Sequence, residues 1–188
     1  MPGLVVLTVD ASETLTQSKE DSENEEKSQA SLVNYWTDEK GLMHVVNRSA
    51  DPLTEALVYI VVKQADLTPN YGDPEWKFWN QVGLYAVIID TIDPCSGISI
   101  SATDVTEGYA SDSAPIEEPV NSSTSVGMIN FVDSNGVPWV RTDGHLIKES
   151  ENTDRIFLRM SKEHNAKAAM LKNQRAVEPI KSCSDPSK

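Results

Sequence analysis

The chain has 188 residues and a formal net charge of −13. Residues 31–150 hold six basic and 17 acidic residues, and a body this acidic repels phosphate backbones, which argues against nucleic-acid binding. Only 39% of the residues are hydrophobic, which indicates that part of the chain lies outside a packed core.

The first 28 residues predict an acidic, disordered segment. Residues 8–28 are almost entirely polar or charged and cannot bury enough apolar surface to offset the entropy of ordering. From about Glu25 the composition favours a short helix that ends near Gly41. Its apolar face consists of Ala30, Val33, Tyr35 and Trp36.

The centre of the chain predicts short strands separated by turn residues. Residues 98–103 alternate Ile and polar side chains, as in a half-buried strand, and residues 85–91 form an apolar run typical of a central strand. Residues 66–80 and 104–125 are predicted connections, rich in turn and polar residues. The seven predicted strands are residues 42–47, 53–64, 85–91, 98–103, 126–132, 137–141 and 145–148.

Two tight turns join the last three predicted strands. Asn135-Gly136 and Asp143-Gly144 supply residues that tolerate a positive φ, and apolar or aromatic residues flank them. The strand spacing predicts a mainly β fold, an immunoglobulin-like antiparallel β-sandwich of about seven strands. It occupies residues 29–150 together with the leading helix, and a helix over about 153–176 forms a partly disordered tail at 151–188.

Cys95 and Cys183 are the two cysteines, too few for a disulfide scaffold and without the spacing of a zinc site. We expect both to be reduced in a cytoplasmic protein. The apolar run at residues 4–7 is too short to span a bilayer and makes a poor signal peptide.

Three segments stand out: residues 29–36, residues 45–53 with an Asn-x-Ser-x-x-Pro turn, and residues 131–141 with a Phe-x-Asp-x-x-Gly-x-x-Trp-x-Arg hairpin. In this order they resemble a group of uncharacterised actinobacterial proteins that carry a C-terminal β-sandwich domain and are often membrane-anchored. The resemblance covers about residues 29–148 and implies a lineage and an architecture, not an activity. Asp93-Pro94-Cys95 stands where the family has Pro-Pro-Gly. The upstream membrane helix of that family is missing, so membrane association would need sequence ahead of Met1.

Four residues are predicted to form a binding surface: Trp76, Trp79, Trp139 and Arg141. Trp76 and Trp79 belong to an aromatic-rich connection, and such a loop suits a groove for a peptide or a carbohydrate. Trp139 and Arg141 share one face of their strand, and both residue types are common at binding hot spots. The alternative is structural, with Trp139 sealing the sandwich and Arg141 paired to Asp133 or Asp143.

Catalysis and metal binding have little support in the sequence. The Asp133–Gly136 turn resembles a calcium loop, but the first position of such a loop requires an acidic residue, and Phe131 stands there instead. No Gly-x-Ser-x-Gly element is present. Cys95 with His145 as a base is the remaining nucleophile pair, although no cation lies near the thiol in the sequence.

The sequence therefore predicts a non-catalytic interaction module that needs no cofactor and whose expected partner is another protein. A small-ligand or carbohydrate-binding sandwich is the first alternative, and an enzyme of unknown type using Cys95 and His145 is the second.

Overall fold

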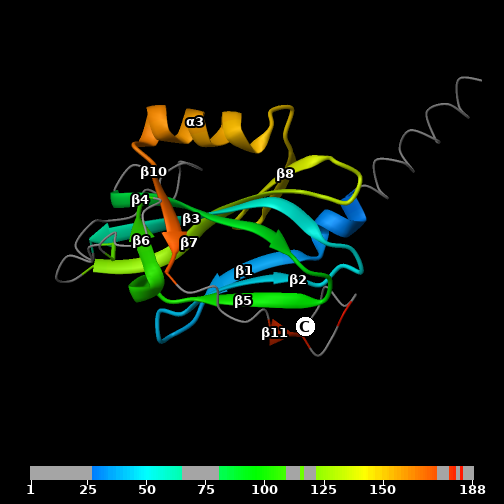
Figure 1. Cartoon of the computed structure of the whole chain (residues 1–188), viewed down its shortest axis with the longest axis horizontal. Helices are drawn as coiled ribbons and strands as arrows, with labels where there is room; N and C mark the ends of the chain where they lie inside the picture. Colours follow the sequence, from blue (N-terminus) through cyan, green and yellow to red (C-terminus); the bar gives the residue numbers. More distant parts are fainter. Residues whose placement is uncertain are drawn as a thin grey trace, which may run out of the picture.

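The computed structural model describes residues 27–64, 81–108, 115–116, 122–172, 178–180 and 183. These residues are mainly β, with eleven strands in two sheets, as the prediction of a β-sandwich requires (Figure 1). The predicted disordered segment lies outside the described residues except for residues 27 and 28. Among the described residues, no helix is long and apolar enough to cross a membrane.

The smaller sheet has four strands, all antiparallel to their neighbours. In spatial order they are β1 (Val33–Thr37), β2 (Met43–Asn47), β5 (Ser96–Ile100) and β11 (Glu178–Pro179). A 3-10 turn, η1 (Ala102–Asp104), follows β5 and leads the chain into the other sheet.

The larger sheet has seven strands, and only the contact between β10 and β4 is parallel. In spatial order they are β6 (Val105–Glu107), β10 (Lys167–Leu171), β4 (Gln81–Ile92), β3 (Leu53–Gln64), β7 (Ser122–Val132), β8 (Pro138–Thr142) and β9 (His145–Lys148). All seven predicted strands are present, although β4 and β7 begin several residues earlier than the sequence indicates and β5 ends at Ile100, three residues before the predicted end. Four further strands, β1, β6, β10 and β11, raise the number above the seven expected.

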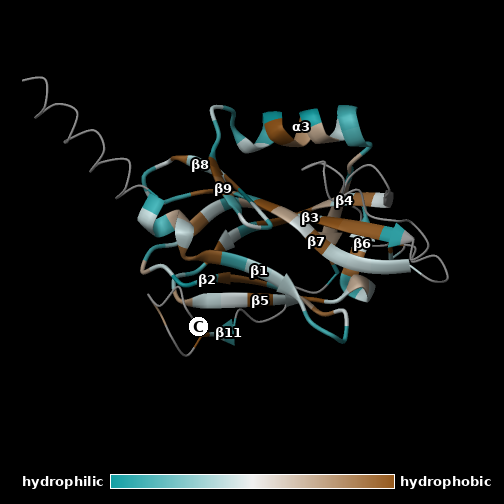
Figure 2. Cartoon of the chain, turned by 180° about the vertical axis from the view of Figure 1, so that it is seen from behind, coloured by the Kyte–Doolittle hydropathy of each residue, from teal (hydrophilic) through white to brown (hydrophobic). Residues whose placement is uncertain are grey.

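One helix, α3 (Thr153–His164), forms a third layer over the outer face of the larger sheet (Figures 1 and 2). The strands that it connects, β9 and β10, point in the same direction, because β10 is parallel to β4 and the pairs from β4 to β9 alternate. A chain can join two parallel strands only by returning along the sheet, and α3 makes that return.

Apolar side chains fill two cores, one on each face of the larger sheet. Val58 and Ile60 of β3 point toward the smaller sheet, whereas Tyr59 and Val61 point toward α3. Ile156 and Met160 of α3 complete the second core. A strand buried on both faces reads as a continuous apolar run, which explains the composition of β3 and β4.

The predicted helix over residues 25–41 is wrong beyond its first turn. Helical geometry covers residues 27–31, and β1 follows at once. Val33 and Tyr35 contact the core between the sheets, whereas Trp36 on the opposite face is exposed. This alternation is the period of a strand, and five register pairs with β2 provide the hydrogen-bonding partner that a helix would not use.

The predicted helical tail is also wrong in its second half. The helix starts at Thr153 as expected, but it ends at His164, and its C-cap Asn165 has a left-handed backbone with φ of 55°. Residues 167–171 then enter the larger sheet, and residues 178–179 join the smaller one. The described residues 167–171 and 178–179 are therefore part of the sandwich.

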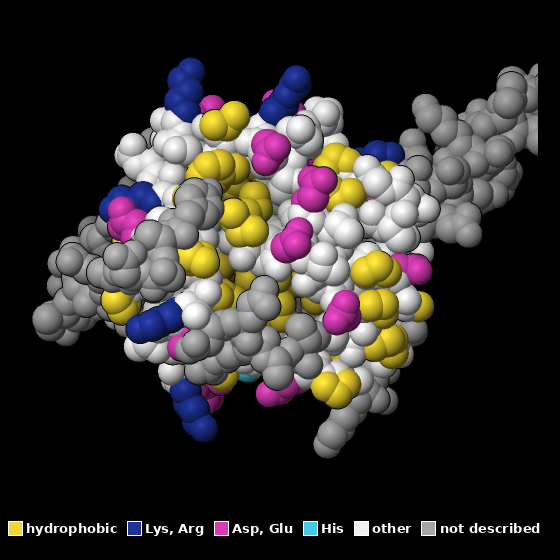
Figure 3. Space-filling model, in the orientation of Figure 1, with side chains coloured by type: hydrophobic (Ala, Val, Ile, Leu, Met, Phe, Trp, Pro, Cys, Tyr) yellow, Lys and Arg dark blue, Asp and Glu magenta, His cyan; other side chains and the backbone are white. Residues whose placement is uncertain are grey.

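Beside α3 the outer face of the larger sheet carries apolar side chains that the helix does not cover. Ile88 is 44% exposed and pairs in register with the half-buried Leu57. Ile147 on the edge strand β9 is 50% exposed. Figure 3, in the orientation of Figure 1, shows groups of hydrophobic side chains on this side of the molecule with acidic side chains next to them.

Candidate functional site

Two of the four predicted binding residues, Trp76 and Trp79, lie outside the described residues. Their assignment to a binding surface stays a prediction. Gln64 and Gln81, the described residues on either side of this connection, lie at the ends of β3 and β4. Gln64 pairs in register with Ser122, so β3 ends beside the start of β7.

Trp139 is a core residue, which corrects its assignment to a contact surface. The side chain is 1% exposed, and its indole Nε1–H donates to Asp133 Oδ2 at 2.8 Å. Asp133 Oδ1 accepts the backbone N–H groups of Asn135 and Val137, both at 2.9 Å. Trp139 therefore has the structural role that the sequence left as the alternative.

Arg141 connects the two sheets. Its Nη2–H donates to Asn34 Oδ1 of β1 at 2.7 Å, and not to the acidic side chains that were expected. Next to it, the Tyr35 hydroxyl donates to the Gly127 carbonyl at 2.8 Å. Burial, and to a lesser extent the nearby Asp143 carboxylate, raises the pKa of Tyr35 above its ordinary value. The half-buried guanidinium of Arg141 thus holds the edge of the sandwich together.

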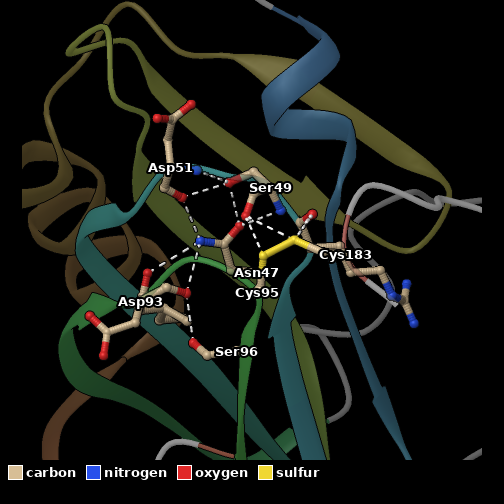
Figure 4. The surroundings of a disulfide bond; sticks show 9 residues. Asn47, Ser49, Asp51, Asp93, Cys95, Ser96 and Cys183 are labelled. Atoms are coloured by element: carbon tan, nitrogen blue, oxygen red, sulfur yellow. Dashed lines mark hydrogen bonds between the residues drawn. A yellow bond between two sulfur atoms is a disulfide. The ribbon is translucent and has the colours of Figure 1, made fainter. Parts of the chain in front are cut away.

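The prediction of two reduced cysteines is wrong, because Cys95 and Cys183 form a disulfide with Cα atoms 5.2 Å apart (Figure 4). No thiol remains at residue 95 to act as a nucleophile, and His145 is exposed on β9. The Cys95/His145 enzyme hypothesis therefore fails on its nucleophile.

A polar pocket of about 570 Å³ lies at one end of the sandwich. Its walls come from the β1–β2 turn, from the segment after β5 and from the start of β7. Seven of its twelve lining residues carry hydroxyl groups: Thr37, Ser101, Thr103, Ser122, Ser123, Thr124 and Ser125. Asp38, Glu39, Lys40, Gly41 and Ala102 complete the lining. We call this site the hydroxyl pocket.

The β1–β2 turn in the pocket wall is fixed by Asp38. Its Oδ1 accepts the backbone N–H groups of Lys40 and Leu42, both at 2.9 Å. The hydrogen bond from the Leu42 N–H is the main cause that lowers the pKa of Asp38 below its ordinary value, and the bond to His44 adds to it. The carboxylate is therefore charged at neutral pH and is partly used inside the turn.

An exposed aromatic group adjoins this turn on the outer face of the smaller sheet. The Trp36 ring is stacked on the His44 ring with centroids 4.8 Å apart, and Trp36 is 43% exposed. His44 is held on both sides, with Nδ1 3.0 Å from Ser99 Oγ and Nε2 3.4 Å from Asp38 Oδ2. The two contacts fix the imidazole plane and thereby the indole that lies on it.

Ser99, His44 and Asp38 are the residue types of a hydrolytic triad, but Ser99 does not have the backbone position of a nucleophile. A nucleophilic serine is presented on a sharp turn. Ser99 lies within the regular strand β5 and pairs in register with His44. We therefore assign the three residues to positioning the Trp36 ring. Among the described residues, no group of three or more His, Cys, Asp or Glu side chains could hold a metal ion.

One signal for the hydroxyl pocket was present in the sequence and was not used, the run Ser122-Ser123-Thr124-Ser125. Within a predicted loop such a run is unremarkable. Its meaning depends on the proximity of residues 37–41 and 101–103, which only the fold brings to the same end of the sandwich.

The fold and the pocket define a mainly β protein with a polar surface site. Comparison with protein-family models, with curated proteins and with solved structures finds no match to the chain.

Proposed function

We propose that this protein is a non-catalytic binding module that holds a small polyhydroxylated ligand, a carbohydrate or a polyol, in the hydroxyl pocket. The observation that carries the proposal is the concentration of seven Ser and Thr residues around one cavity. A hydroxyl can donate one hydrogen bond and accept others, so those of Ser101 and Thr103, which bond each other at 2.9 Å, and of Thr37, which accepts the Val126 N–H, can still bond the hydroxyl groups of a sugar.

Two neighbouring features support a carbohydrate. The carboxylates of Asp38 and Glu39 line the pocket and accept hydrogen bonds from ligand hydroxyls. Trp36, the residue before Thr37, offers an exposed aromatic ring that His44 holds in a fixed orientation. An aromatic ring with one exposed side provides apolar contact beside polar groups.

The test is titration of the full chain with a panel of mono- and oligosaccharides, followed by calorimetry and tryptophan fluorescence. The Ser101→Ala/Thr103→Ala variant removes two pocket hydroxyls and should weaken binding by about 30-fold, since the two lost hydrogen bonds contribute about 1 kcal/mol each. Thr54→Ala, at an exposed site of β3 outside the pocket, is the matched control and should bind as the wild type does. Equal affinities of the two variants, or no binding across the panel, would reject the proposal.

A second candidate is the interaction module that the sequence predicts, now on a different surface. The exposed Ile88 and its neighbour Leu57 form an apolar strip beside α3 that suits a protein partner. Affinity capture with the full chain and with Ile88→Glu would test it, with Thr54→Ala as the control. A partner that binds Ile88→Glu as well as the wild type would exclude this strip.

The disulfide favours an oxidising compartment over the cytoplasm, because disulfides are rare where cellular thiols keep proteins reduced. We therefore propose that the protein works outside the cytoplasm. Membrane association through upstream sequence, the relation to the actinobacterial proteins and an immunoglobulin-like topology stay predictions. Redox labelling of Cys95 and Cys183 in native cells would test the compartment.

A further inference from the structure

We propose that the outer edge of β5 is an acceptor for an extended peptide strand. The C-terminal segment of the chain, defined as residues 178–180 and 183, occupies this edge, and the Cys95–Cys183 disulfide controls whether it stays there. This inference concerns a different surface from the hydroxyl pocket and does not depend on the ligand proposed for it.

The described ladder between β11 and β5 is short. It has two register pairs, Glu178 with Gly97 and Pro179 with Ser96. One further hydrogen bond runs from the Ile180 N–H to the Cys95 carbonyl at 2.9 Å. On its other side, β5 pairs with β2 along all five of its residues. A ladder of two pairs is weak by itself, so the covalent bond to Cys183 supplies much of what keeps the segment in place.

The edge of β5 also favours one type of side chain in the strand that binds to it. A Cβ atom on Gly97 would lie 2.8 Å from Val46 Cγ1 and 3.7 Å from Ile180 Cγ2. The clash with Val46 requires glycine at residue 97, and Ile180 Cγ2, at ordinary van der Waals distance from the same position, packs over this glycine. The edge therefore fits an extended peptide with a branched apolar residue at the position of Ile180.

The half of the site around Cys95 is held by contacts that do not involve the disulfide. The Cys95 N–H donates to the Ser49 carbonyl at 3.1 Å, and the residue has a φ of 53°. Asn47 Nδ2 donates to the carbonyls of Asp51, Ile92 and Asp93, and Ser96 Oγ donates to Asp93 (Figure 4). Cys95 is thus fixed on the sandwich. Cys183 is exposed, with its sulfur 3.4 Å from the Arg48 carbonyl oxygen.

Release of the segment is a thiol–disulfide exchange with a dithiol reductant, such as a protein dithiol. A reductant thiolate attacks the exposed Cys183 sulfur, the Cys95–Cys183 bond breaks, and Cys95 leaves as a thiolate that takes up a proton. The second reductant thiol then attacks the mixed disulfide and frees Cys183. The protein gains two electrons and two protons, the reductant becomes a disulfide, and the edge of β5 opens to another strand.

The first readout is hydrogen–deuterium exchange of the unmodified full chain, oxidised and reduced. We expect reduction to speed exchange in residues 96–100 by about tenfold or more, because local opening sets the exchange rate. Residues 133–137, in a turn distant in sequence from the disulfide, are the internal control and should speed up less than residues 96–100. Unchanged exchange in residues 96–100 would overturn the proposed control by the disulfide.

The second readout tests the acceptor itself with a peptide of residues 173–188 whose cysteine is activated by thionitrobenzoate. The full chain with Cys183→Ser presents the free Cys95 thiol, which displaces thionitrobenzoate and joins the peptide by a disulfide. The native peptide should react about tenfold faster than a matched Ile180→Asp peptide, because docking raises the local concentration of the reacting sulfur. Equal rates would show that the edge does not recognise the strand.

Discussion

Asp133 is the residue on which the closing hairpin depends. It is 3% exposed, yet its carboxylate accepts hydrogen bonds from two backbone N–H groups and from the Trp139 indole. Hydrogen bonds to a buried charged acceptor are stronger than those between neutral groups. The polar residue thereby sets both the β7–β8 turn and the orientation of the largest buried side chain.

Replacing Asp133 with Ala should lower the free energy of unfolding by roughly 3 kcal/mol, because it leaves three donors without an acceptor. Urea denaturation of the two proteins measures the difference. Asn135→Ala, at an exposed position in the same turn, should change stability by less than about 0.5 kcal/mol. A loss of similar size in both variants would show that the turn, and not the carboxylate, is responsible.

The ionisation of Asp38 should make the stability of the folded chain depend on pH. Its pKa is lowered in the folded chain, mainly by the Leu42 N–H, so ionised Asp38 contributes stability above the pKa of the unfolded chain. This contribution is lost as the pH falls through the lowered folded-state pKa. Asp38→Asn keeps an acceptor oxygen but cannot titrate, so its stability should fall less than that of the wild type between pH 7 and pH about 3. Parallel acid-dependence curves would contradict this role.

At the scale of elements, α3 shows how tertiary contacts select one face of a helix. Ile156 is 1% exposed in the second core, whereas Leu158 on the opposite side is 64% exposed. The sequence predicts the start of this helix correctly, and in the structure Asn152 accepts the Arg155 N–H as its N-cap. It misses the end because Ala168, Ala169, Met170 and Leu171 are compatible with a helix as well as with a strand.

The substitution Ile156→Ala should destabilise the protein by roughly 2–5 kcal/mol, because it leaves a cavity between α3 and the larger sheet. Leu158→Ala, on the same helix but exposed, should stay within about 0.5 kcal/mol of the wild type. Thermal or urea unfolding of both variants distinguishes them. If the two variants are equally stable, α3 does not pack on the sheet through Ile156.

The strands show where local sequence is sufficient. The β7–β8–β9 segment follows from Asn135-Gly136 and Asp143-Gly144, and Gly136 and Gly144 both have the positive φ that these turns need. At β1 the same kind of argument fails. Val33, Tyr35 and Trp36 fit both a helical stripe and a strand, and the pairing with β2 decides between them.

On the scale of the whole molecule, the disulfide joins residues separated by 88 positions and ties the C-terminal segment to the smaller sheet. Closing so long a loop restricts the unfolded chain, and this is the main way in which disulfides stabilise proteins in the chain-entropy model. The covalent bond thus acts on the stability of the entire sandwich as well as on the edge of β5.

Reduction, or the double substitution Cys95→Ser/Cys183→Ser, should lower the free energy of unfolding by roughly 2–4 kcal/mol. Denaturation with and without reductant measures this, and the double variant should not respond to reductant. Thiol titration of the denatured protein should give two thiols after reduction and none before it. Two thiols before reduction would show that the bond does not form.

As with the fold, only part of the candidate site could be predicted from the sequence. The sequence identified aromatic and basic residues as candidates, but it could not tell the buried Trp139 from the exposed Trp36, because exposure depends on which strand covers which. The hydroxyl pocket combines segments around residues 40, 102 and 123 that have no local signal in common. Its prediction would require the sheet order itself.

By itself, the sequence determined that the chain is acidic and mainly β, where most of its strands lie, and that tight turns close its last hairpins. These properties depend on charge, on a period of two and on turn residues, all of which act over a few positions. Only the tertiary structure decided that residues 33–37 form a strand, that residues 167–171 enter the larger sheet and that Cys95 meets Cys183. Each of these outcomes depends on a partner distant in the sequence, and neither propensity nor periodicity carries information about such partners.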